Sequence, residues 1–232
     1  MNSPAQVGVA HRDLLEENSS WGWIRVAFWI CIVIAVAVVI RRILALVYPP
    51  RSVPAQMAAL DAAFASHAAL TLAHILPAML FVLLLPLAYS RRFAGAKWFD
   101  RLLFGLGVVV SITAYSMTRY AIGGWVERSA VLVFNTLFLF SLVRAWRFLA
   151  NNRLLHLQWL TRAVGILLGI ATTRPVMGVF FATSRLTHLT PPQFFGIAFW
   201  IGFSINSFAI ELWLRSRNGQ AQITTLASAK RA

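Results

Sequence analysis

A few histidine and arginine residues interrupt long apolar stretches of this chain, and their side chains carry its most promising chemistry. His67 and His74 lie seven residues apart, so a helix places them on one face, two turns apart. Ionisable groups inside a membrane are costly and commonly mark functional sites. We therefore predict one ligand-binding cluster in the outer half of the protein. Its members are His67, His74, Tyr115, Arg119 and Arg174.

The predicted cluster is basic and has no acidic partner at its depth. Among the seven acidic residues only Glu211 lies in an apolar stretch, and Asp61 and Glu127 fall in the predicted connections. A buried guanidinium needs a counter-charge. An anionic small molecule, a lipid headgroup, a haem propionate or a quinone oxygen would satisfy Arg174. Alternatively, its long side chain extends to the outer headgroups and binds nothing specific.

A second polar cluster is predicted near the cytoplasmic surface. Three of its residues recur at helical spacing at the start of the fifth apolar stretch, and two lie on the last one. We favour a structural interpretation of this cluster, in which its residues anchor the helices at the interface and form a salt bridge between them. The members are His156, Trp159, Arg162, Asn206 and Glu211.

Histidines could also ligate haem b between helices. His67 and His74 are about 10 Å apart on one helix, so they cannot bind one iron from opposite sides. His156 is predicted at the cytoplasmic edge, far below His74. His67 with His188 is the remaining candidate pair, and the cofactor stays open.

The composition is that of a polytopic membrane protein. The chain has 232 residues, of which 59% are hydrophobic and only 12% charged, with a mean hydropathy of +0.71. A soluble domain has about 25% charged residues. These values exclude a soluble enzyme, a disordered chain and a disulfide scaffold. The net charge of +14 does not indicate nucleic acid, because the basic residues cluster between apolar stretches.

Six apolar stretches are long enough to cross a bilayer, which takes about 20 helical residues. Backbone groups in lipid must bond internally, so the expected fold is an all-α transmembrane bundle in one domain. Segment 48–66 is predicted to form an amphipathic helix on the outer surface. A segment at 1–22 precedes the bundle and a basic tail at 214–232 follows it. The predicted spans are 23–47, 67–89, 102–120, 131–148, 160–182 and 195–213.

The distribution of basic residues predicts the orientation. With six spans, fourteen Lys and Arg residues fall on the side of the two termini and seven on the other. The positive-inside rule then places both termini in the cytoplasm. We expect a multi-pass protein of the bacterial cytoplasmic (inner) membrane whose first span is an uncleaved anchor.

Three segments of the second half of the chain carry spaced polar and aromatic residues. They are H-x-x-W-x-x-R at 156–162, T-x-R at 172–174 and W-x5-N-x4-E-L-x-L-R at 200–215. Together they resemble an uncharacterised bacterial family of predicted multi-spanning membrane proteins, known only as a domain of unknown function. The resemblance covers residues 65–215 and implies six helices but no activity. Leu160 stands where the family usually has methionine, and the family's histidine–arginine pair after the second span is absent.

Three functions of different classes follow from these patterns. The first is binding of a small anionic or lipid-like ligand in the outer polar cluster. The second is a small b-type haem or quinone redox protein. The third is a structural partner in a membrane complex. No glycine-rich phosphate loop, paired carboxylates or nucleophile elbow is present, so the sequence leaves enzymatic activity open.

Overall fold

The computed structural model describes residues 22–48, 55–90, 93 and 96–229, and every regular element among them is helical. Within these residues six helices are, by length and composition, able to cross a membrane, which agrees with the predicted all-α class and six spans. The predicted segment 1–22 lies, except for Gly22, outside the described residues. The elements are α2 (Gly22–Val47), α3 (Ala55–Ala65), α4 (Ala68–Ala88), α5 (Lys97–Met117), η1 (Thr118–Tyr120), α6 (Gly124–Phe148), α7 (Arg153–Leu167), α8 (Gly169–Thr187) and α9 (Pro191–Ala229).

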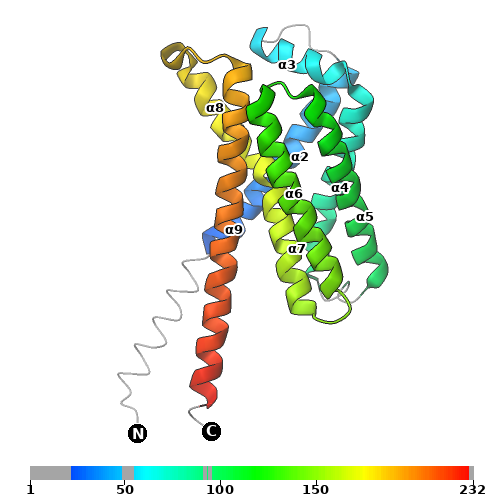
Figure 1. Cartoon of the computed structure of the whole chain (residues 1–232), viewed down its shortest axis with the longest axis vertical. Helices are drawn as coiled ribbons and strands as arrows, with labels where there is room; N and C mark the ends of the chain where they lie inside the picture. Colours follow the sequence, from blue (N-terminus) through cyan, green and yellow to red (C-terminus); the bar gives the residue numbers. More distant parts are fainter. Residues whose placement is uncertain (1–21, 49–54, 91–92, 94–95, 230–232) are drawn as a thin grey trace.

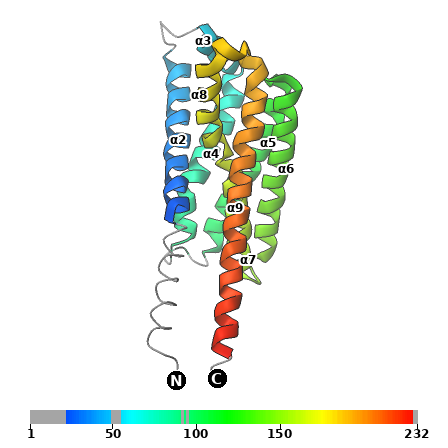
Figure 2. The ribbon, with the colours of Figure 1, turned by 90° about the vertical axis from the view of Figure 1, so that its left-hand side faces the viewer.

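The helices form one bundle with α3 across one end (Figure 1). Neighbours along the chain pack as pairs, α4 with α5, α6 with α7 and α8 with α9, and α9 also contacts α6 and α7. Helix α2 lies at the periphery, against α4 and α8 (Figure 2). Helix α2 begins, and α9 leaves, at the end opposite to α3. We call these two ends the α3 end and the α6–α7 loop end.

Several helices extend beyond the predicted apolar stretches. The third, fourth and fifth spans occupy Lys97–Tyr120, Gly124–Phe148 and Arg153–Ser184. Polar and basic residues at helix ends remain helical at the interface while their side chains reach water, so an apolar run underestimates helix length. The fifth span bends at Leu168, where α7 ends and α8 begins. Part of the predicted tail is helical, because α9 continues to Ala229.

The buried core lies among α4 to α9, and α2 contributes little to it. Phe81, Phe99 and Phe194 are almost fully buried, whereas Ile32 is the buried residue of α2. The outer faces of the helices carry large exposed apolar side chains, among them Trp29 and Val33 of α2. An apolar exterior is what a hydrocarbon environment requires.

Glycines allow α9 to lie directly against its neighbours. A Cβ atom at Gly202 would lie 2.6 Å from the backbone nitrogen of Thr173 on α8. A Cβ atom at Gly196 would lie 2.6 Å from the backbone nitrogen of Glu127 on α6. Small residues permit this close approach of helices in membranes. The seam fixes how α8 and α6 face the interior near the α3 end.

Candidate ligand-binding cavity

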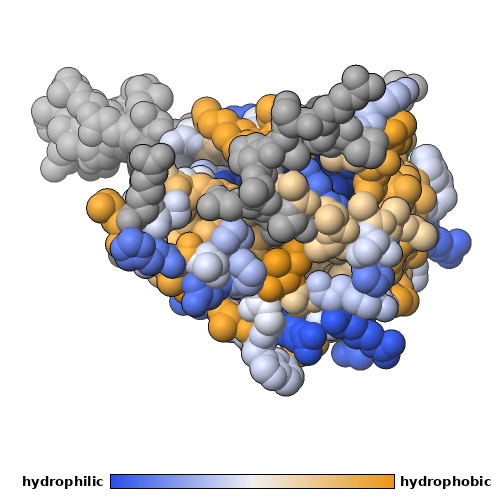
Figure 3. Space-filling view, turned by 90° about the horizontal axis from the view of Figure 1, so that it is seen from above, coloured by the Kyte–Doolittle hydropathy of each residue, from blue (hydrophilic) through white to orange (hydrophobic). Residues whose placement is uncertain are grey.

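A cavity of about 230 Å³ lies in the half of the bundle nearest α3. Helices α2, α4, α5, α6 and α9 contribute most of its wall, and α3, η1, α7 and α8 add further residues. Most lining side chains are aliphatic or aromatic. Viewed onto the α3 end, hydrophilic residues also lie recessed between hydrophobic ones (Figure 3). An apolar cavity with a few convergent polar groups is the usual form of a ligand site.

Three of the five residues predicted for the outer cluster line this cavity. His67 lines it from the position just before α4, His74 from α4 itself and Arg174 from α8. Tyr115 and Arg119 are not brought into it. The Tyr115 hydroxyl lies 2.7 Å from the Thr136 hydroxyl of α6, and Arg128 donates to the Arg119 carbonyl over 3.2 Å.

The surroundings of the Arg174 guanidinium give the strongest indication that the cavity binds an anion. Its Nη1 atom lies 3.8 Å from the sulfur of Met177, a weak acceptor, and its Nε atom is shut off from solvent without a hydrogen-bond partner. No carboxylate pairs with it among the residues that the structure describes. Arg41 and Arg42 repel it further. A buried guanidinium in this condition is costly unless a ligand supplies negative charge.

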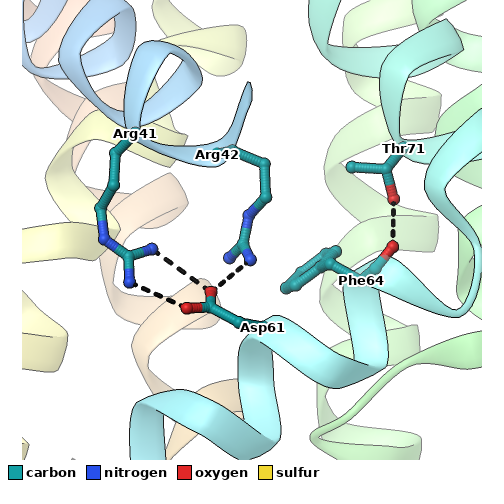
Figure 4. Close-up of polar contacts among 5 residues, drawn as sticks. All are labelled: Arg41, Arg42, Asp61, Phe64 and Thr71. Carbon is teal, nitrogen blue, oxygen red and sulfur yellow. Dashed lines mark hydrogen bonds and ion pairs between the residues drawn. The ribbon is translucent and has the colours of Figure 1, made fainter. Parts of the chain in front are cut away.

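Arg42 supplies a second guanidinium to the cavity, and it is held by an aspartate of α3 (Figure 4). Its Nη1 atom lies 2.6 Å from Oδ1 of Asp61, and Nη2 of Arg41 lies 3.2 Å from Oδ2 of the same residue. One carboxylate therefore serves two arginines. Arg174 lies nearby, so one carboxylate serves a group of three guanidiniums, of which Arg42 and Arg174 line the cavity.

The same contacts hold α3 over the cavity. The Arg42 guanidinium lies 4.1 Å from the centre of the Phe64 ring, a cation–π distance. The Thr71 hydroxyl on α4 donates to the Phe64 carbonyl over 3.2 Å (Figure 4). Helix α3 is thus tied to α2 through Arg42 and to α4 through Thr71. Part of the predicted segment 48–66, residues 49–54, lies outside the described residues; within the rest the structure places α3, whose Ala63 and Phe64 line the cavity.

The two histidines are already positioned by other groups. Nδ1 of His67 lies 2.9 Å from the Ser66 hydroxyl, and its ring packs on Tyr120 with centroids 3.6 Å apart. Nδ1 of His74 lies 3.0 Å from the Thr113 hydroxyl, which itself donates to the Val109 carbonyl over 2.7 Å. Because that hydroxyl proton is used, His74 donates from Nδ1, and Nε2 is the acceptor of the neutral ring.

The sequence reasoning missed several polar lining residues, and three of them are Arg42, Glu127 and Asn135. Arg42 shares a helical face with Ala35, Val38 and Val39, and this spacing could have placed it beside the cavity. Glu127 accepts a hydrogen bond from the backbone of Gly123 over 2.7 Å. Its carboxylate is therefore engaged at the start of α6 and is not the counter-charge of Arg174. The third, Asn135, donates to the Ser111 carbonyl over 3.0 Å.

The residues do not fit axial haem ligation. His188 ends α8 in a left-handed conformation (φ 52°) and is not among the lining residues, whereas His67 is. His67 and His74 flank two turns of one helix. Among the described residues, no group of three or more His, Cys, Asp or Glu side chains could hold a metal ion.

The five residues of the predicted cytoplasmic cluster do not form one site in the structure but fall into three separate groups. Arg162 pairs with Glu211 over 2.9 Å and lies 4.6 Å from the centre of the Trp159 ring. Asn206 accepts a hydrogen bond from Thr172 over 2.6 Å. His156 joins neither group. Spacing along one helix gives a shared face but does not say which neighbouring helix that face meets.

His156 instead belongs to a buried ionic cluster that ties α5 to α7. Its Nε2 atom lies 3.4 Å from Oδ1 of Asp100, whose Oδ2 lies 3.1 Å from Nη1 of Arg153. Nδ1 of His156 donates to the Ala145 carbonyl of α6 over 2.8 Å, and Arg153 donates to the Ala88 carbonyl of α4 over 3.2 Å. Four helix ends meet here, which gives the cluster a structural role.

Comparison with known proteins found no match to this chain among protein-family models, curated proteins or solved structures.

Proposed function

We propose that this membrane protein binds an anionic amphiphile, a molecule with a negatively charged headgroup and a hydrocarbon chain, in the cavity at the α3 end. The observation that carries the proposal is Arg174, a guanidinium on the wall of an apolar cavity that pairs with no carboxylate of the described residues. The bacterial inner membrane, cytoplasmic termini and membership of the uncharacterised family described above belong to the same proposal.

The headgroup chemistry follows from the surplus charge. Arg174 and Arg42 both line the cavity, and Asp61 neutralises Arg42 in part. Guanidinium groups recognise carboxylates and phosphates through parallel hydrogen bonds. A carboxylate or phosphate between these two arginines would supply the charge that the protein lacks.

The distribution of polar groups along α4 indicates that the ligand carries a hydrocarbon chain. The lining runs from His67 to Val82, fifteen residues or about 22 Å of helix. Its polar members, His67, Thr71 and His74, all lie toward α3, and the deeper part is apolar. A headgroup near α3 with a chain extending inward matches this division. Since typical ligand pockets measure about 300–1,000 Å³, the small volume favours one slender chain over two.

Binding of palmitate to the detergent-purified protein tests the proposal. Palmitate should bind, whereas palmityl alcohol, which has the same chain without the charge, and acetate, which has the charge without the chain, should bind far more weakly. Arg174→Gln should weaken palmitate binding about ten- to hundredfold, the effect of losing a charge-assisted hydrogen bond. Arg119→Gln is the matched control, because Arg119 lies near the same end but does not line the cavity.

Two results would contradict the proposal. Equal losses in Arg174→Gln and Arg119→Gln would show that general surface charge attracts the ligand. Tight binding of decyl-ubiquinone or palmityl alcohol that does not depend on Arg174 would show an uncharged ligand and favour the quinone alternative.

A further inference from the structure

Two guanidinium groups lie over one tryptophan ring at the α6–α7 loop end. Arg144 of α6 and Arg162 of α7 have their Cζ atoms 5.1 Å and 4.6 Å from the centre of the Trp159 ring. Arg144 also lies 5.1 Å from the centre of the Phe148 ring. The Trp159 ring is itself packed edge-on against Phe140, with centroids 5.6 Å apart. These aromatic contacts fix the position of both cations.

The charges of the two arginines are not equally balanced. Arg162 donates from Nε to Glu211 over 2.9 Å, and Glu211 also accepts from Arg215 over 3.0 Å. Arg144 pairs with no carboxylate in the part of the chain that the structure describes. Its Nε atom is closed to solvent and has no hydrogen-bond partner. Arg144 and Arg162 together therefore carry more positive charge than Glu211 neutralises, and the Nε–H donor of Arg144 is enclosed without an acceptor.

Ordinary interfacial anchoring does not account for Arg144. A side chain that snorkels keeps its charged head in water, as the exposed Arg147 one turn later on α6 is free to do. Arg144 instead lies between two aromatic rings with part of its guanidinium enclosed. The two rings fix the Arg144 guanidinium in position, as expected of a residue that binds an anion.

We propose that Arg144, Trp159 and Arg162 form a binding site for the phosphate of an anionic phospholipid. The phosphate oxygens would accept from Arg144 and from the donors of Arg162 that Glu211 does not use, since a guanidinium has five N–H groups. The predicted orientation places this end at the cytoplasmic leaflet, where anionic lipids concentrate and basic sites between helices bind their headgroups. None of the three residues lines the cavity at the α3 end, so the site is independent of the ligand proposed for the cavity and rests only on the orientation proposed above.

Native mass spectrometry of the detergent-solubilised protein with dioleoyl phosphatidylglycerol tests the site. Dioleoylglycerol, which has the same chains and no phosphate, is the lipid control. Arg144→Gln should weaken binding of phosphatidylglycerol about tenfold, as expected for the loss of a charge-assisted hydrogen bond. Arg147→Gln removes the same charge from the same helix and should leave the affinity within about twofold, because exposed charges contribute little.

Arg144→Lys keeps the charge but loses the planar fork, so it should also bind the lipid more weakly than the wild type. Wild-type affinity in Arg144→Lys, or equal losses in Arg144→Gln and Arg147→Gln, would overturn the proposal in favour of general charge attraction. Tight binding of dioleoylglycerol would overturn the role of the phosphate. Displacement of the lipid by millimolar inorganic phosphate would show a site for the free anion and overturn the assignment to a lipid.

Discussion

Replacing Asp100 by asparagine should loosen the α6–α7 loop end of the bundle. The Asp100 side chain is 2% exposed and lies 3.1 Å from Arg153 and 3.4 Å from His156. The substitution keeps the size of the side chain and removes its charge. It therefore tests the electrostatic part of the contact between α5 and α7.

The magnitude follows from the distance and the exposure. Two unit charges 3.1 Å apart attract by about 5 kcal/mol at an effective dielectric constant of about 20. Desolvation of the carboxylate offsets part of this attraction, and losing one partner of a buried pair commonly costs about 3–5 kcal/mol. The Arg153 side chain is 31% exposed and can turn toward water once Asp100 is gone. We therefore expect the free energy of unfolding to fall by about 2–3 kcal/mol.

Reversible unfolding in mixed detergent and dodecyl sulfate micelles measures this change. Lys97→Gln is the matched control, because Lys97 begins the same helix but is exposed, and it should change the free energy of unfolding by less than about 0.5 kcal/mol. A double-mutant cycle with Arg153→Met should give a coupling of at least about 1 kcal/mol. A loss no larger than that of the control, or no coupling to Arg153, would refute the assignment of an ionic contact.

Three further predictions concern the cavity, the helix seam and the orientation. Asp61→Asn should tighten palmitate binding several-fold, because Asp61 competes with the ligand for Arg42; weaker binding would show that the position of α3 matters more than the charge. Gly202→Ala should destabilise by about 1–3 kcal/mol through overpacking against α8, whereas Gly178→Ala, where a Cβ meets nothing within 4 Å, should not; loss of folded protein on heating separates the two variants. A reporter fused after Arg231 should be active only in the cytoplasm, and a periplasmic signal would contradict the predicted orientation.

The class of the protein and the number of candidate spans can be predicted from the sequence alone. Length and apolarity act along one helix at a time, so six crossing segments are visible without knowledge of their neighbours. The two-turn spacing of His67 and His74 is also a property of one helix, and both residues line the same cavity. The apolar stretches predict the helix ends less accurately, because polar residues continue the helices at the interface.

Which residues meet across helices could not be predicted in this way and is known from the packing of the bundle. Arg42 joins Arg174 at the cavity, while Arg119, of the same type and near the same end, does not. His156 meets Asp100, fifty-six positions earlier, and leaves the cluster that its spacing with Trp159 had suggested. Such pairings depend on how each helix is rotated and how closely it approaches its neighbours. The glycines of α9 set one such approach, against α8 and α6, and periodicity along a single helix carries no information about it.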